Sequence, residues 1–396
     1  MGKITVVHII TKLELGGAQQ NTLFTVNHLD PTAFDVVLIS SSEGILIEEA
    51  LKLSNVTVHL IPELVREIGP LKDLKALFKI KTILKQLKRD QQKESRENAG
   101  DIIVHTHCSK AGILGRWAAY LAGIRCIVHS YHGFSFNVFQ PALLSAFYIF
   151  LERITSIITT KFIMVSKTNI EKGIHEKIFV RDKVVLIRSG IDIEKFQQAE
   201  STMKTKRKEL AVSDDIPLIA MIACLKPQKA PLDFVKVANS VLQYTREAHF
   251  VLVGDGVLRP EVEKLIRQLG IDNKIVLLGW RRDIPEIMKC INVLVLTSLW
   301  EGVPRVLPQA MSLGIPIVAT EVDGTPEAVQ NGVNGFVLPP GDIEGIAEKI
   351  IYLITHPEKA RDMGEKGKRL VNEFDIWKMM NQQEQLYVEL LQLNAH

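Results

Sequence analysis

The sequence predicts an α/β protein with two doubly wound parallel sheets, each covered by helices on both faces. Three observations favour this fold class: short runs of Val, Ile and Leu recur, a helix-like stretch follows each run, and the rhythm occurs twice. Continuous apolar runs are typical of parallel strands that are buried on both faces. A chain of 396 residues is long enough for two or three domains.

Seven apolar runs predict the strands of a first domain: 4–10, 36–39, 56–61, 102–105, 126–129, 162–165 and 184–187. Six more predict the second sheet: 218–222, 250–253, 275–278, 293–297, 317–319 and 336–338. The domain break is expected within "RSGIDIEKFQQ", residues 188–198, where a glycine ends a strand and a lysine-rich stretch follows. Ligands of such folds bind outside the carboxyl ends of the strands, which predicts a site in the cleft between the domains.

The composition excludes several classes of protein. Hydrophobic residues make up 46% and charged residues 23%, as in globular domains, and the net charge of +3 is too small to indicate a nucleic-acid partner. The four cysteines lack CxxC spacing, which indicates a reducing compartment and no structural zinc. The chain shows neither a secretory leader nor a charge-free run of 18 apolar residues, so we expect no membrane-spanning helix.

Glycines and cations follow several predicted strands. Gly16 and Gly17 follow the first strand in "TKLELGGAQQNTL", where a glycine pair lets the backbone approach a phosphate; a tight turn explains them equally well. Lys226 and Lys229 precede a helix expected to begin near Pro231, a place that suits a diphosphate as well as two solvated lysines. The spacing is not the GxGxxG fingerprint, which argues against a dehydrogenase.

Further candidates lie at other strand ends. Gly254, in "LVGDGVLRPEVEKL", and Arg281, in "LLGWRRDIPEIM", occupy equivalent turns, where a ligand contact and a plain turn are both consistent with the pattern. His132, in "YHGFSFN", is placed to hydrogen-bond a sugar hydroxyl. A metal cluster formed by His105, His107, Cys108 and His129 is an alternative, but such spacings are more typical of ordinary loop contacts, so we predict no metal.

Two segments are apolar enough for a role at a surface. Residues 71–89 carry seven basic residues against the single acid Asp73, with leucines at helical spacing, which fits either an amphipathic helix on an anionic membrane or a packed surface helix. Residues 138–165 are rich in aromatics but interrupted by charges, and fit either an apolar acceptor-side helix or core. The polar segment 89–100 is expected to be a loop.

The most informative stretch is "SLWEGVPRVLPQAMSLGIPIVAT", residues 298–320. Glu301 follows an apolar strand at a glycine turn, Pro304 and Arg305 are expected in the first turn of a helix, and Gln309 about two turns into it. Together with Gly16–Gly17, Lys229, the "GDG" of 254–256 and the "SGID" of 189–192, this stretch resembles the donor site of the retaining GT-B glycosyltransferases of family 4. "HTHCSKAGILGRWAAYLAGI" followed by "YHGFSFN" is similar to bacterial members that build capsule, exopolysaccharide or O-antigen.

The resemblance implies a role for each matching position. Glu301 would face the donor sugar, and residue 309 would hold the ribose hydroxyls. Lys229 would neutralise the diphosphate, and His132 would contact the sugar from the other domain. The backbone of the intervening turn would meet the sugar and the phosphates: Gly302, Val303, Pro304, Arg305 and Val306. The family's final helix implies three parts: an N-terminal domain over 1–190, a nucleotide-sugar domain over 191–373, and a returning helix over 374–396.

Two positions depart from the family pattern, and both departures remove a charge. Residue 309 is Gln where the family usually has Glu, and Cys224 stands where Arg is frequent. A neutral hydrogen bond contributes about 0.5–1.5 kcal/mol against about 1.5–3 for a charge-assisted one, so some affinity is lost while the geometry is kept. Lys226 is close enough in sequence to replace the missing cation.

These expectations converge on a metal-independent and cofactor-independent retaining transferase. It would move a sugar from a nucleotide donor, expected to be a UDP-sugar, to a lipid-linked glycan acceptor. We expect it in the cytoplasm or peripherally on the inner face of the cell membrane. Two alternatives stay open: a nucleotide-sugar epimerase of the same fold, for which no matching acid/base residues are evident, and a nucleotide-sugar-binding protein weakened in catalysis by Cys224 and Gln309.

Overall fold

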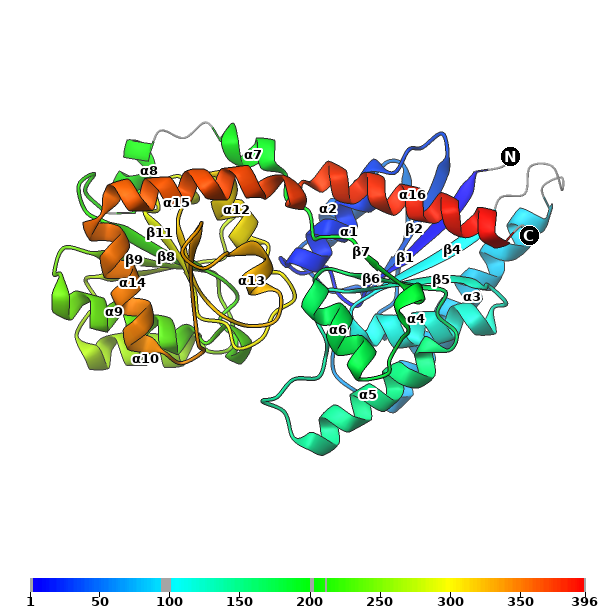
Figure 1. The fold of residues 1–396 in the computed structure, drawn as a ribbon. Coiled ribbons are helices and arrows are strands. Elements are labelled where there is room, and N and C mark those ends of the chain that lie inside the picture. The colour runs from blue at the N-terminus through cyan, green and yellow to red at the C-terminus, as the bar shows by residue number, and fades with distance from the viewer. Residues whose placement is uncertain (1–2, 94–100, 200–202, 211, 395–396) are drawn as a thin grey trace. The chain divides into compact units, whose positions relative to one another are not determined.

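A computed structural model describes residues 3–93, 101–199, 203–210 and 212–394 (Figure 1). The chain divides into two compact units, one comprising Met1–Gly190 with Ile376–His396, and the other comprising Ile191–Asp375. Each unit is built around one parallel sheet, and the fold class predicted from the apolar runs is confirmed. Within the described residues, no helix combines the length and the apolarity needed to cross a membrane.

The first unit holds a seven-stranded parallel sheet in the order β3-β2-β1-β4-β5-β6-β7. Each predicted apolar run of the first half forms one of its strands: β1 Ile4–Ile9, β2 Phe34–Ser40, β3 Val56–Leu60, β4 Ile102–His107, β5 Cys126–Tyr131, β6 Lys161–Met164 and β7 Val184–Leu186. The helices are α1 Gly17–His28, α2 Ile47–Leu51, α3 Pro70–Lys93, α4 Ser109–Leu121, α5 Ala142–Ser156, α6 Lys167–His175, the 3₁₀ turn η1 Arg181–Lys183 and, after the second unit, α16 Ile376–Asn394.

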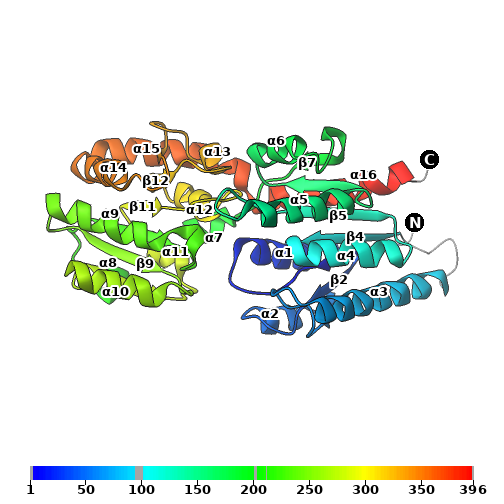
Figure 2. The same cartoon turned by 90° about the horizontal axis from the view of Figure 1, so that it is seen from below.

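Two helical layers cover this sheet. Helices α1 and α16 pack on one face over a core that includes Val6, Val128 and Tyr387. Helices α3 and α4 pack on the other face over Val7 and Ile127, and α5 lies against α4 (Figure 2). The loop expected over 89–100 is partly wrong, because α3 continues to Lys93; residues 94–100 lie outside the described part of the chain.

The second unit holds a six-stranded parallel sheet in the order β10-β9-β8-β11-β12-β13. Its strands are the six runs predicted from the second half: β8 Leu218–Ile222, β9 His249–Val253, β10 Ile275–Gly279, β11 Val293–Leu296, β12 Ile317–Thr320 and β13 Gly335–Leu338. Its helices are α7 Ile193–Gln197, α8 Met203–Glu209, η2 Pro227–Lys229, α9 Pro231–Tyr244, α10 Arg259–Leu269, α11 Ile284–Met288, α12 Val306–Ser312, α13 Thr325–Ala328, α14 Ile343–Thr355, α15 Pro357–Leu370 and η3 Val371–Phe374.

The C-terminal helix α16 returns to the first unit. It contributes Ile376, Met379, Met380, Leu386, Tyr387 and Leu390 to the core beneath α1. The chain enters this helix close to the point where it left the unit. A Cβ atom built at Gly190 would lie only 2.6 Å from the Cα atom of Ile376. On the other side of the boundary, the Ile191 backbone N–H donates to the carbonyl of Phe374 at 2.8 Å.

Candidate active site

The strand order of the second sheet reverses between β8 and β11, which are hydrogen-bonded neighbours. At such a reversal the loops that follow the two strands leave toward opposite faces, and ligands bind between them. Lys229 belongs to the loop after β8, and Glu301 belongs to the loop after β11. The topology therefore brings the two polar residues emphasised by the sequence to one point of the second unit.

Glu301 and Lys229 form an ion pair through Glu301 Oε1 and Lys229 Nζ. Both side chains are largely buried, 7% and 16% exposed respectively. Ser298 Oγ donates to the same carboxylate oxygen at 2.6 Å. The Glu301 backbone N–H donates to Asp323 Oδ2 at 2.7 Å, which fixes the turn. A cation and a hydroxyl thus share the Oε1 atom of the carboxylate, while the Gln228 side-chain amide makes only a long contact of 3.5 Å with Oε2.

The two loops are joined by further hydrogen bonds. The Leu299 N–H donates to the Gln228 carbonyl at 2.8 Å, and the Gln228 side chain donates to the Trp300 carbonyl at 2.7 Å. Thr297 Oγ1 donates to the carbonyls of Lys229 and Ala230, at 3.0 Å in each case. Sequence reasoning missed Thr297, Gln228 and Ser298, although their position beside the strand end was a usable signal. These contacts place the Lys229–Glu301 pair before any ligand arrives.

The helix after Glu301 begins later than expected. Helix α12 spans Val306–Ser312, with Arg305 at its N-cap, so Gln309 is the fourth helical residue and lies about one turn in, not two. Val303 and Pro304 are buried in the turn before it, and the Gly302 carbonyl accepts from the Gly324 N–H at 3.0 Å. Burial lowers the pKa of the Arg305 guanidinium, which nevertheless stays protonated at neutral pH.

The loops after β9 and β10 serve a different purpose. Gly254 has a φ of +128°, and a Cβ atom there would lie 2.1 Å from the Ala223 carbonyl oxygen, so glycine is required by close approach to the loop that contains Cys224 and Lys226. Arg281 donates to Glu209 at 2.6 Å and to Asp283 at 2.6 Å, and these carboxylates raise its pKa. A ligand phosphate would have to compete with both of them for Arg281.

In the first unit, Gly16 is the N-cap of α1 and Gly17 is its first residue. No side chain caps this end, and its first turn holds no acidic residue. His132 follows β5, beside a small pocket within the first unit that is also lined by His107, Ser130 and Gln383. The first unit therefore presents an uncapped helix start and a histidine-lined pocket.

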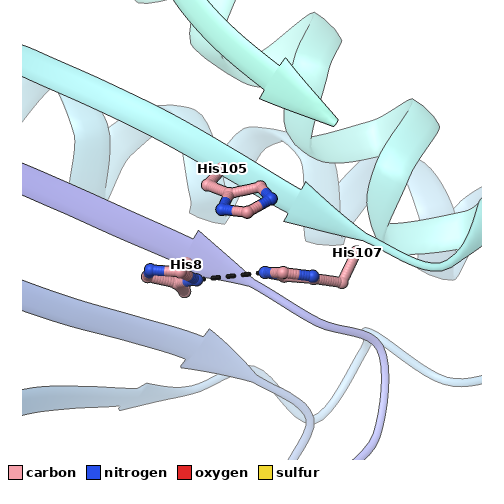
Figure 3. A group of neighbouring side chains, drawn as sticks. All are labelled: His8, His105 and His107. Atoms are coloured by element: carbon pink, nitrogen blue, oxygen red, sulfur yellow. Dashed lines mark hydrogen bonds between the residues drawn. The ribbon is translucent and has the colours of Figure 1, made fainter. Parts of the chain in front are cut away.

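Three buried histidines meet where the strand order of the first sheet reverses, between β1 and β4 (Figure 3). His8 on β1 is paired in register with His105 on β4, and His107 lies two residues further along the same face. His8 Nδ1 lies 3.0 Å from His107 Nε2, and His107 Nδ1 lies 3.4 Å from His132 Nε2. Burial lowers the pKa of His8 to about 3 and holds those of His105 and His107 well below 6.5, so all three are neutral at pH 7.

One nitrogen from each of these rings lies within 4.8 Å of the others, a spacing that could hold a metal ion. The hydrogen bonds favour a different interpretation. His105 Nδ1 lies 2.6 Å from the Tyr387 hydroxyl, and His105 Nε2 lies 2.7 Å from Ser130 Oγ. Three zinc-bound imidazoles each direct a lone pair at one point about 2 Å away. Here every ring nitrogen of the three except His8 Nε2 has a hydrogen-bond partner among the described residues, so metal binding through the bonded nitrogens would break hydrogen bonds that already exist.

The histidine set differs from the one considered in the sequence. His129 lies on the opposite face of the sheet, because residues of a strand alternate between faces, and its Nδ1 lies 2.8 Å from Thr106 Oγ1. His8, which no motif indicated, takes its place. The signal was present in the pairing of the first and fourth strands, since the two strands that flank the reversal of a doubly wound sheet are neighbours.

Two family models match the chain, one for each unit. "Glycosyltransferase Family 4" matches residues 15–195, and "Glycosyl transferases group 1" matches residues 202–370. The UDP-Gal:alpha-D-GlcNAc-diphosphoundecaprenol alpha-1,3-galactosyltransferase of Escherichia coli is 32% identical over 98% of both chains. The protein is a family 4 glycosyltransferase. The resemblance drawn from the motifs is thereby confirmed.

Other relatives and solved structures agree with this assignment. The capsular polysaccharide biosynthesis glycosyltransferase CapM of Staphylococcus aureus is 24% identical over 89% of each chain. The structure of HepE from Anabaena in complex with UDP and glucose superposes with a TM-score of 0.81 at 20% identity, over 97% of this glycosyltransferase and 99% of HepE. The glycosyltransferase therefore has the GT-B fold.

Proposed function

We propose that this glycosyltransferase moves a hexosyl group from a UDP-sugar to a lipid-linked glycan acceptor, with retention of anomeric configuration, during synthesis of a cell-surface polysaccharide. The observation that carries the proposal is the Lys229–Glu301 pair at the strand reversal of the second unit. The E. coli relative, by its name, combines UDP-galactose with a diphosphoundecaprenol-linked acceptor, so UDP-galactose is the first donor to test.

The pair suits departure of a nucleoside diphosphate. As the glycosidic bond of the donor breaks, negative charge grows on the diphosphate, and fixed cations or helix N-termini stabilise that charge. Lys229 precedes α9, whose N-terminus carries no side-chain cap. We propose that the diphosphate takes over the Lys229 ammonium group from Glu301, which leaves the carboxylate free to accept hydrogen bonds from the donor sugar.

In this proposal, departure of the diphosphate needs no divalent metal, because the lysine and the backbone N–H groups supply the positive charge. The Gln309 side chain, one turn into α12, is proposed to hold the ribose, where no charge develops. His132 in the first unit is proposed to contact the sugar. Lys226 and Arg305 add positive charge to the sequence segments around the pair.

The decisive experiment incubates the purified protein with UDP-, GDP- and ADP-sugars and a synthetic GlcNAc-diphosphate lipid, and follows nucleotide release. We expect UDP release that depends on the acceptor, survives EDTA and gives an α-linked product by NMR. A β-linked product would contradict retention, and activity lost in EDTA and restored by Mg²⁺ or Mn²⁺ would contradict metal independence. Epimerised donor without transfer would favour the epimerase alternative, and donor binding without turnover would favour the binding protein.

A further inference from the structure

Helix α5 of the first unit exposes an apolar stripe and buries polar side chains. Its buried residues are Glu152 and Thr155, which are both polar. Tyr148 and Ile149 pack, partly buried, against the core cluster that includes Tyr131 and Phe162. Five other large apolar side chains face solvent and recur at the spacing of one helical face: Leu143 at 86% exposure, Phe147 at 48%, Phe150 at 56%, Ile154 at 36% and, just past its end, Ile157 at 76%. A surface helix ordinarily turns its apolar stripe toward the core, so packing does not explain this stripe.

Polar contacts also hold α5 against the protein. Glu152 accepts from Arg116 Nη2 at 2.7 Å and from the Tyr131 hydroxyl at 2.5 Å. Trp117 Nε1 donates to Thr155 Oγ1 at 3.1 Å. These bonds orient the helix with Glu152 and Thr155 inward. The buried network therefore fixes the orientation of α5, and with it the exposure of the apolar stripe.

The stripe belongs to a broader face formed by α3, α4 and α5, which lie side by side in one layer over the sheet (Figure 2). Helix α3 buries Ala76, Ile80 and Leu84 against the sheet. Its outer side exposes further apolar residues, as does the turn before it: Ile68 at 67%, Leu71 at 78%, Leu74 at 52% and Phe78 at 51%. We call this surface the α3–α5 face.

The charge around the α3–α5 face is strongly positive. Helix α3 carries eight basic residues against two acids, of which Asp73 is already paired with Lys110 at 2.6 Å. The single carboxylate of α5, Glu152, is buried. Basic residues surround the end of α5 where Ile157 lies: the Lys183 ammonium donates to the Thr159 carbonyl at 3.0 Å, and Arg125 and Lys161 flank the adjoining strands.

We propose that the α3–α5 face docks on the surface of an anionic lipid bilayer. The apolar stripe of α5 enters the boundary between headgroups and acyl chains, and the lysines of α3 contact the headgroups. Apolar side chains on one side and basic residues beside them are the combination that binds such a surface. The proposal does not depend on the transferase reaction, since none of these residues belongs to the donor site.

The experiment is co-sedimentation of the full chain with vesicles of phosphatidylcholine alone or mixed with phosphatidylglycerol, without nucleotide-sugar. We expect binding to the anionic vesicles that weakens with salt. Phe147→Ser with Phe150→Ser should weaken it by at least about tenfold, because burial of these rings is lost. The matched control, Tyr244→Ser with Val257→Ser, changes two residues of the second unit that are 70% and 75% exposed, and should bind as the original protein does.

A second pair of variants tests the charge. Lys75→Glu with Lys85→Glu should abolish the preference for phosphatidylglycerol; Lys79 is avoided because it is ion-paired with Glu63 at 2.6 Å. Equal losses in the α5 and control variants, or no binding by the original protein at low salt, would overturn the proposal. So would an α5-dependent dimer in analytical ultracentrifugation without vesicle binding. Vesicle binding by a protein without transferase activity would refute the proposed function and leave the docking face standing.

Discussion

Replacing Glu152 by leucine should destabilise the first unit far more than a change at any exposed position of α5. Glu152 is one of the two buried residues of this helix, and its carboxylate accepts from both Arg116 and Tyr131. The side chains of Arg116 and Glu152 are 0% and 1% exposed. Without the carboxylate, the Arg116 guanidinium stays buried and loses the counter-ion that offsets its desolvation.

The expected loss follows from that burial. Breaking a buried ion pair by removing one partner costs about 3–5 kcal/mol of unfolding free energy. For a unit of this size each kcal/mol lowers the melting temperature by about 2–4 °C, so the transition of the first unit should fall by roughly 6–20 °C. Replacing Arg116 by methionine in the same chain should recover much of this loss, since an apolar pair of similar volume avoids the buried charge.

Differential scanning calorimetry of the single and double variants measures these shifts. The matched control is Arg153→Leu, the neighbouring residue on the same helix, whose side chain is 46% exposed and lies 3.7 Å from Glu176. An exposed pair of this kind contributes at most about 1 kcal/mol. If Glu152→Leu costs no more than Arg153→Leu, or if the double variant is as unstable as Glu152→Leu, the buried pair does not anchor α5.

Three further predictions concern the two clusters of polar residues. Lys229→Ala should lower kcat by much more than about threefold while the melting temperature changes little; a smaller kinetic effect would mean that Lys229 is not the phosphate cation. Glu301→Gln should lower kcat strongly, whereas Gln309→Glu should leave kcat nearly unchanged and tighten donor binding, because only interactions that strengthen in the transition state raise turnover; a Glu301→Gln enzyme with unchanged kcat would contradict the role of the carboxylate. Burial lowers the pKa of His8 from 6.5 to about 3, so its share of stability is present above pH 6.5 and is lost as the pH falls, by about 2 kcal/mol between pH 7 and 5. His8→Gln should therefore flatten the acid limb of stability measured in urea, and an unchanged slope would show that His8 does not titrate in this way.

Much of the fold could be predicted because buried parallel strands appear in the sequence as continuous apolar runs. All thirteen apolar runs form strands, since a strand buried on both faces tolerates few polar residues. The pairing of Lys229 with Glu301 also follows from topology, because the first and fourth strands of a doubly wound sheet are neighbours. What the residues do with a donor stays a prediction.

The remaining features depended on which way the side chains point, which the apolar content of a segment does not encode. The sequence shows that 138–165 is apolar, but not that Leu143 and Phe150 face solvent while Glu152 faces the interior. The start of α12 was also misjudged, since Pro304 lies in the turn before the helix and not in its first turn. His8 was overlooked because its partners come from strands almost one hundred residues away.

The placement of α16 has a consequence for synthesis of the chain on the ribosome. The core under α1 is incomplete until Ile376, Met379 and Tyr387 have been made, whereas the second unit can close as soon as residue 375 emerges. At ordinary translation speed the intervening residues, about 200, take roughly 10–40 s. The unit made second can thus fold first, while the face of the nascent N-terminal sheet that α1 and α16 share stays partly uncovered, which makes this sheet a suitable substrate for a chaperone during that interval.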